Sequence, residues 1–218
     1  MADEPREPPT TRGRDYAERL ERLQNKWWKK AFDVQAPYRW NLRRWNLGRT
    51  LDVGCGNGRN LMSLPEGSVG VDHNPMLVEA ARARGCEAYT DAEFFADERL
   101  TRPGGFDALL AAHLIEHLTA SQARTILGSY LPFVRAGGRV VFITPQERGH
   151  ASDPTHLDFV DHDALRALAA DLGLTVERAY SFPFPRWAGR VFTYNEFVLV
   201  CHTEAATGSN EGAPATRA

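Results

Sequence analysis

Short apolar runs alternate with amphipathic segments along most of this chain. The near-continuous apolar runs predict buried strands at residues 49–53, 68–72, 86–89, 106–112 and 139–144. Apolar positions at helical spacing predict helices between them, at 75–84, 121–135 and 162–172. Cap residues support the ends of these helices: Asn74 with Pro75, Gly85, Asp161 and Gly173. The pattern is therefore one of strand and helix in alternation.

Two further predicted strands, at 174–182 and 191–201, close the pattern. Since no helix signal lies between them, we expect them to pair antiparallel. Alternation that ends in two strands without a crossover predicts an α/β fold with a doubly wound, mostly parallel sheet and one antiparallel strand. A chain of 218 residues suits one such domain with appendages at its ends.

The ends of the chain differ from this core. Residues 1–13 and 204–218 are rich in Pro, Thr, Ala, Gly and charge, and they predict disordered tails. Residues 14–48 carry apolar and aromatic positions at helical spacing, which predict an N-terminal helical lid. Its aromatic stripe also offers a surface for a homodimer. The domain itself is expected at 49–203.

Composition narrows the class of protein. The net charge of −2 gives no global attraction to nucleic acid or to an anionic membrane, and no apolar run is long enough to cross a bilayer. The acidic, proline-rich beginning does not read as a secretory signal. Cys55, Cys86 and Cys201 stand in apolar surroundings, which favours reduced thiols in a cytoplasmic protein.

A glycine-rich turn follows the first predicted strand. Gly54, Gly56 and Gly58 allow the backbone to turn tightly and to approach a ligand, and a helix start is expected after them. Such a turn opens a nucleotide-binding sheet. Arg59 stands where the dinucleotide fingerprint has its third glycine, so a nicotinamide dinucleotide is not favoured. Asp72 ends the second strand, where a carboxylate accepts ribose hydroxyls.

These segments together resemble the class I S-adenosylmethionine (SAM) dependent methyltransferases. The resemblance covers residues 36–202 through LDVGCGNGRN, VGVDHNP, FDALLAAHLIEHL and AGGRVVFITPQ, in that order. It implies a Rossmann-like sheet of seven strands with SAM as the methyl donor. It also implies that SAM is contacted by Tyr38, Arg39, Asp52, Gly54, Cys55, Gly56, Asn57, Gly58, Asp72, His73, Asn74, Asp91, Ala92, Glu93 and Ala111.

Ionisable residues gather after the fourth predicted strand. His113, Glu116 and His117 are spaced i, i+3 and i+4, which places them on one face of a helical turn, and His156 lies in the loop after the fifth strand. Three interpretations stay open. The group is structural, as in related methyltransferases; His113 is a general base; or Glu116, His117 and His156 bind a divalent cation such as Mg²⁺ or Mn²⁺. The third is similar to the small-RNA 2′-O-methyltransferases, although His113 replaces their first glutamate.

Two segments that are expected to border the pocket for the methyl acceptor are rich in aromatic residues: QAPYRWNLRRW and SFPFPRWAGRVFTYNEF. Flat aromatic faces beside Asp, His and Arg suit a hydroxylated small molecule or an oligosaccharide. The same segments resemble an actinobacterial subgroup with sugar O-methyltransferases of polysaccharide biosynthesis. We therefore expect an O-methyltransferase. The alternatives are an enzyme like the RNA 2′-O-methyltransferases, suggested by the basic first fifty residues, and a non-catalytic SAM-binding regulator.

Overall fold

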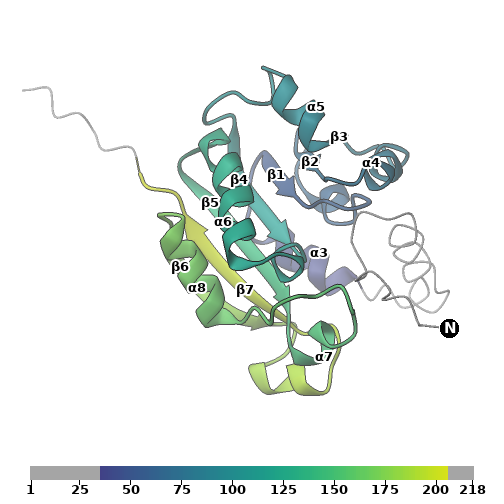
Figure 1. Cartoon of the computed structure of the whole chain (residues 1–218), viewed down its shortest axis with the longest axis vertical. Helices are drawn as coiled ribbons and strands as arrows, with labels where there is room; N and C mark the ends of the chain where they lie inside the picture. The colour runs from purple at the N-terminus through teal and green to yellow at the C-terminus, as the bar shows by residue number, and fades with distance from the viewer. Residues whose placement is uncertain (1–34, 206–218) are drawn as a thin grey trace, which may run out of the picture.

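The computed structural model describes residues 35–205. The predicted tails, apart from residues 204 and 205, and most of the predicted lid lie outside this range. A sheet of seven strands forms the centre (Figure 1). Its strands are β1 (Thr50–Val53), β2 (Val69–Val71), β3 (Ala88–Tyr89), β4 (Phe106–Ala112), β5 (Val134–Pro145), β6 (Thr175–Phe182) and β7 (Glu196–His202). They lie in the order β3-β2-β1-β4-β5-β7-β6. Strand β7 runs antiparallel to both of its neighbours, and the other pairs are parallel. The predicted sheet with one antiparallel strand is confirmed.

Helices cover both faces of this sheet. They are α3 (Ala36–Arg43), α4 (Pro75–Arg82), α5 (Asp91–Ala96), α6 (Ala120–Tyr130), α7 (Glu147–His150) and α8 (His162–Asp171). Figure 1 shows α6 and α8 in front of the sheet and α3 behind it. Successive side chains of β4 point to opposite faces of the sheet, which accounts for the two layers of helices. Leu109 packs in the core cluster that includes residues of α6 and α8, whereas Leu110 packs in the cluster that includes Leu42 of α3.

Helix caps behave as the sequence predicts. The Met76 amide donates to Asn74 Oδ1 at 3.0 Å, and Pro75 occupies the first turn of α4. The side chain of Asp161 likewise accepts from the first turn of α8. Gly85 and Gly173 follow these helices with φ of 82° and 68°, a conformation that glycine adopts without a steric penalty.

Several predicted boundaries are wrong. The glycine turn is followed only by a short 3₁₀ helix, η1 (Leu61–Ser63), since Pro65 disfavours a helix before it. Helix α6 ends at Tyr130 and a second 3₁₀ segment, η3 (Leu131–Phe133), leads into β5, which begins at Val134. Strand β7 begins five residues later than predicted, at Glu196.

Two short helices lie in segments predicted as loops. Helix α7 stands in the segment that the sequence predicts as a loop after the fifth strand, and η4 (Arg186–Arg190) stands between β6 and β7, where no helix is predicted. Within residues 35–205, none of the helices combines the length and apolarity that crossing a membrane requires.

Candidate functional site

A cavity of about 850 Å³ opens at the edge where the parallel strands end. Its wall includes the turn after β1, the ends of β2 and β4, and the segments after β5. Because β7 is antiparallel, its first residue, Glu196, also reaches this edge. Ligands of open α/β sheets bind in this position, beyond the carboxyl ends of the strands.

The glycine turn forms one side of the cavity. Gly54 and Gly56 have φ of 76° and 55°, in the left-handed region. A Cβ on Gly54 would lie 2.9 Å from Leu114, so no larger residue fits there without displacing that side chain. The turn is tied to β2, because the amides of Gly54 and Cys55 both donate to the carbonyl of Val71. These contacts fix the turn before any ligand binds.

Asp72 joins this turn to the start of α4. Its Oδ2 accepts the Gly56 amide and its Oδ1 accepts the Asn74 amide, both at 2.9 Å. The side chain is only 6% exposed, and burial raises the pKa of the carboxyl while the two amides act to lower it. Each oxygen keeps a further lone pair that can accept a ligand hydroxyl.

Asp52 lies behind the turn and does not line the cavity. It is buried, and within residues 35–205 neither carboxylate oxygen has a hydrogen-bond partner. Burial, followed by the negative charge of Asp72, raises its pKa to about 7. An unpaired carboxyl in such a position is costly to the fold, which points to a functional reason for its presence.

The structure brings about half of the predicted SAM contacts to the cavity. Those that line it are Tyr38, Gly54, Cys55, Gly56, Asn57, Asp72, His73 and Asp91. Those that do not line it are Arg39, Asp52, Gly58, Asn74, Ala92, Glu93 and Ala111. For the second group, direct contact with a ligand in this cavity is not supported by the geometry.

Local packing explains these departures. The side chain of Asn74 is engaged as a helix cap, and Glu93 caps α5 and pairs with Arg82 at 2.8 Å. Ala92 is exposed on the same helix. Ala111 points into the core on the α6 side, so the next residue of β4, Ala112, lines the cavity in its place.

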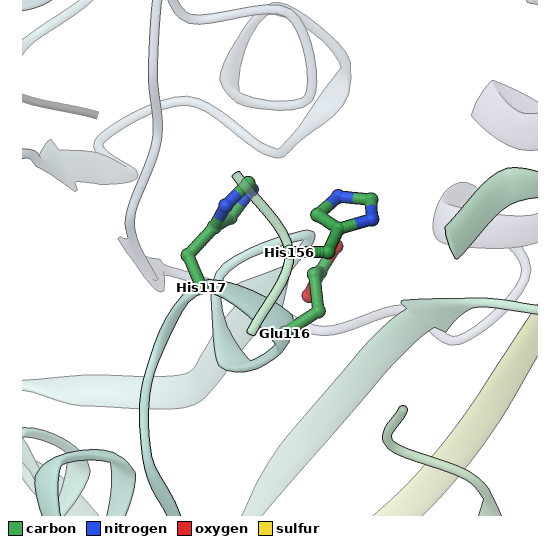
Figure 2. A group of neighbouring side chains, drawn as sticks. All are labelled: Glu116, His117 and His156. Carbon is green, nitrogen blue, oxygen red and sulfur yellow. The ribbon is translucent and has the colours of Figure 1, made fainter. Parts of the chain in front are cut away.

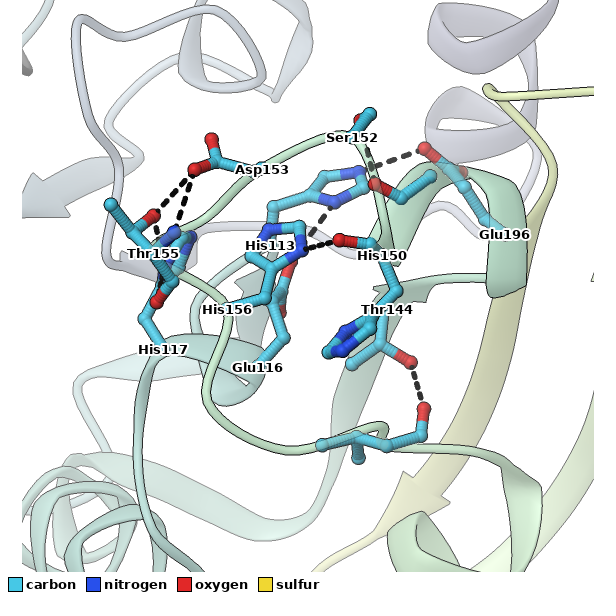
Figure 3. Close-up of polar contacts among 12 residues, drawn as sticks. His113, Glu116, His117, Thr144, His150, Ser152, Asp153, Thr155, His156 and Glu196 are labelled. Atoms are coloured by element: carbon cyan, nitrogen blue, oxygen red, sulfur yellow. Dashed lines mark hydrogen bonds and ion pairs between the residues drawn. The ribbon is translucent and has the colours of Figure 1, made fainter. Parts of the chain in front are cut away.

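His113 occupies the turn that follows β4. It is not on a helix: its φ is 59°, and the 3₁₀ helix η2 (Ile115–His117) begins two residues later. Its Nδ1 lies 3.2 Å from Glu116 Oε1 and its Nε2 lies 2.9 Å from Glu196 Oε1 (Figure 3). Burial acts to lower the pKa of His113, but the two carboxylates outweigh it and raise the pKa to about 9.

This arrangement counts against the prediction that His113 accepts a proton directly. Both ring nitrogens face carboxylates, so neither is directed at an acceptor in the cavity. An imidazole held between two negative charges favours its protonated form, in which it is only a donor. His113 is therefore a residue that links and orients Glu116 and Glu196.

Glu116, His117 and His156 form a compact cluster (Figure 2). One ligand atom from each residue lies within 4.8 Å of the others. His117 Nδ1 lies 3.2 Å from the carbonyl of Thr155, and His156 Nδ1 lies 2.8 Å from that of His150. A carbonyl that accepts from one ring nitrogen fixes the tautomer in which the other can bind a metal, as is usual for histidine ligands.

Electrostatics suit the same cluster. Glu116 is fully buried, and its Oε2 has no hydrogen-bond partner among residues 35–205. Burial acts to raise its pKa, but the contact with His113 prevails and lowers it, so the side chain is a carboxylate. Burial lowers the pKa of His117, which favours the neutral imidazole that metals bind. The residues present fit a divalent cation.

The sequence analysis includes Tyr194 in an aromatic acceptor segment but gives no role to Asn195 and Glu196, which also lie on the cavity wall. Since residues 191–201 read as one strand, these positions appeared to be parts of a pleated strand instead of a rim. The polar run Thr193–Glu196 before five apolar residues was the available signal. Tyr194 also fixes the lid segment, because its carbonyl accepts the Tyr38 hydroxyl at 2.6 Å.

Comparison with known proteins agrees with this geometry. Residues 51–140 match the family described as "Methyltransferase domain". These residues belong to a class I SAM-dependent methyltransferase domain. This match spans the glycine turn, Asp72 and the strands up to β5. The side of the cavity that is formed by the glycine turn and Asp72 therefore belongs to the methyltransferase domain.

Solved methyltransferase structures share the whole fold. A SAM-dependent methyltransferase from Archaeoglobus fulgidus has a TM-score of 0.61 at 18% identity, over 81% of this chain and 98% of that one. The magnesium protoporphyrin IX methyltransferase of Synechocystis, solved with bound SAH, the demethylated product of SAM, has a TM-score of 0.60 at 14% identity, over 89% of this chain and 97% of that one. At such identities the likeness concerns the fold alone.

A curated relative matches a shorter stretch. The human protein "Probable tRNA methyltransferase 9B" is 39% identical over 77 residues, which are 34% of this chain and 16% of that protein. The matched segment is thus a small part of its relative. The match agrees with the presence of a methyltransferase domain and does not identify the methyl acceptor of this chain.

Proposed function

We propose that this chain transfers the methyl group of SAM to a hydroxyl group of a sugar-like acceptor, either a small molecule or an oligosaccharide. One observation carries the proposal: a single cavity is lined by the glycine turn with Asp72 and by the ionisable cluster of Glu116, His117, His156 and Glu196. A donor site and a set of proton-handling groups therefore share one space.

The donor half suits SAM. Asp72 has lone pairs for the ribose hydroxyls, and the bare backbone of Gly56, where a Cβ would meet open space, leaves room for the rest of the nucleoside. The sulfonium of SAM already activates its methyl group. The protein therefore has to supply an in-line approach and a group that takes the proton of the acceptor.

The acceptor half suits a hydroxylated ring. Tyr38 and Tyr194 place aromatic rings on the wall beside Glu196, Asn195 and Asp153. Aromatic faces pack against the apolar faces of a sugar, while carboxylates and amides bind its hydroxyl groups. From Tyr194 a chain of edge-to-face ring contacts leads through Phe192 to Phe184, and the exposed rings of Tyr194 and Phe184 extend this surface outwards, as an oligomeric acceptor would require.

Glu116, His117 and His156 are proposed to hold a divalent cation. Two imidazoles and one carboxylate favour Mn²⁺ over Mg²⁺, because Mg²⁺ prefers oxygen ligands. When bound, such a cation would polarise an acceptor hydroxyl and lower its pKa. Thr155 and the carbonyl of His150 hold the two rings in place, while His113 orients Glu116.

Methyl transfer itself tests the proposal. The chain is incubated with SAM labelled in its methyl group, together with methyl glycosides of common hexoses or with total tRNA. We expect label in a glycoside and one SAH formed per methyl transferred. Label in tRNA alone would replace the sugar acceptor by the RNA alternative. Binding of SAH with no methylation of any acceptor would favour a SAM-binding regulator.

The cation has a separate test. Saturating Mn²⁺ is expected to raise the melting temperature of the wild-type chain by about 5 °C or more, since a ligand that binds only the native state stabilises it. His156→Gln should abolish this rise. His202→Gln, which changes a histidine paired with Glu177 on the surface, is the matched control and should retain it. An equal rise in all three proteins would remove the proposed cation site.

A further inference from the structure

We propose that Glu196 is the catalytic residue that binds the acceptor hydroxyl and takes its proton, and that His113 positions it. This inference rests on the proposed function, since it concerns transfer to a hydroxyl. It assigns the role of the base to a residue at the start of β7, on the cavity wall.

The fold brings Glu196 to the reacting edge and holds it there. Its backbone pairs with Pro145 at the end of β5, and its carbonyl accepts from Gln146 Nε2 at 3.0 Å. Gln146 is itself fully buried and also bonded to Asn195. The backbone that carries Glu196 is thus fixed from two sides, as a catalytic side chain requires.

The side chain of Glu196 faces the cavity at one end of a linear network. Oε1 lies 2.9 Å from His113 Nε2, and His113 Nδ1 continues the network to Glu116 (Figure 3). Glu196 is 10% exposed and lines the cavity, whereas Glu116 is 1% exposed. Of the three groups, Glu196 therefore combines a carboxylate with access to an acceptor.

The neighbouring side chains of Tyr38 and His113 do not compete with Glu196 for the proton of the acceptor. The Tyr38 hydroxyl donates to the carbonyl of Tyr194 at 2.6 Å, so its proton is directed away from Glu196. His113 has both nitrogens committed to carboxylates. A carboxylate that accepts one bond from His113 has lone pairs left for an acceptor hydroxyl.

The reaction balances with the groups present. An oxygen lone pair of the acceptor forms the new C–O bond, and the S–C bond of SAM breaks with its electron pair going to sulfur. The hydroxyl proton passes to a carboxylate oxygen of Glu196, which later releases it to solvent. The positive charge of SAM and the negative charge of Glu196 are both lost, and SAH and the methyl ether are neutral.

Glu196→Gln is the decisive substitution. Gln keeps the shape and can still accept from His113, but it cannot take a proton. We expect kcat for the methyl glycoside to fall about 100-fold to 10,000-fold, the range of a lost general base, with unchanged affinity for SAH. Glu196→Asp, which keeps a carboxylate, should retain more of the rate than Glu196→Gln.

Controls separate this inference from the proposed function. Glu177→Gln removes a carboxylate that contacts His202 at 2.7 Å, at the other end of the β6–β7 pair, and should leave kcat unchanged. His113→Gln should lower kcat without changing the KM for SAM. Its melting temperature should also fall, because the buried Glu116 loses its charged partner. Full activity of Glu196→Gln, or equal losses in Gln and Asp, would overturn the proposal. If the wild type methylates no glycoside, the proposed function fails first and this inference falls with it.

Discussion

Asp72→Ala is expected to lower the affinity for SAH about 100-fold or more. Hydrogen bonds to a charged group contribute about 1.5–3 kcal/mol each, and a ribose offers two hydroxyls to this carboxylate. The substitution also releases the amides of Gly56 and Asn74, both of which Asp72 accepts at 2.9 Å. The turn that faces the cofactor thus loses its tie to α4. Calorimetric titration with SAH measures the change.

Glu93→Ala is the matched control for this experiment. The sequence predicts Glu93 as a second acidic contact of the cofactor, but the structure engages it with Thr90 and Arg82 on the exposed side of α5. Its removal should leave SAH affinity within about 2-fold, because it reaches no part of the cavity. If Glu93→Ala weakens binding as much as Asp72→Ala, the cofactor is not where we place it.

Asp52→Asn is expected to stabilise the ligand-free protein at pH 8. Burial raises the folded-state pKa of Asp52 to about 7, above its ordinary value near 4. Between about pH 4 and pH 7 the carboxyl of Asp52 is therefore protonated in the folded state, whereas in the unfolded state it has released its proton. Stability contributed by this group is present at low pH and is lost as the pH rises towards 7. Asn stays neutral, so it avoids that loss.

The size of the effect follows from the shift. Each pKa unit corresponds to about 1.4 kcal/mol, so a shift of about three units gives an upper bound of about 4 kcal/mol at pH 8. Thermal melts should show a higher midpoint for Asp52→Asn at pH 8 and no difference at pH 4. Asp107→Asn, which alters a carboxylate paired with Arg135, should show no such gain. Equal midpoints at pH 8 would contradict the account of a buried, unpaired carboxylate.

Much of the donor half could be predicted from the sequence. Asn74 as a cap, the turn at Gly54 and Gly56, and Asp72 at the end of β2 are local features, and each is written in adjacent residues. The helix after the turn failed for a local reason as well, since only six residues separate Gly58 from Pro65.

The acceptor half depends on contacts across the sheet, which no local pattern encodes. Glu196 meets His113 across 83 positions because an antiparallel β7 starts where β4 ends. The prediction that Ala111 contacts SAM failed for the same reason, because the direction of its side chain depends on which face of β4 each helix covers. The spacing of His113 and Glu116 did predict their proximity, although a left-handed turn and a 3₁₀ helix achieve it instead of an α-helix.

The close approach of Gly54 and Leu114 limits how this enzyme can be re-engineered. Leu114 lies between His113 and the 3₁₀ turn with Glu116, and it fills the space where a Cβ of Gly54 would be. The loop that faces the methyl donor and the loop that carries the acceptor chemistry are therefore packed tightly against each other, so that a change in one requires a matching change in the other. Exchanging acceptor specificity by grafting segment 113–117 from another methyltransferase will succeed only with a donor turn that fits the grafted residue at 114.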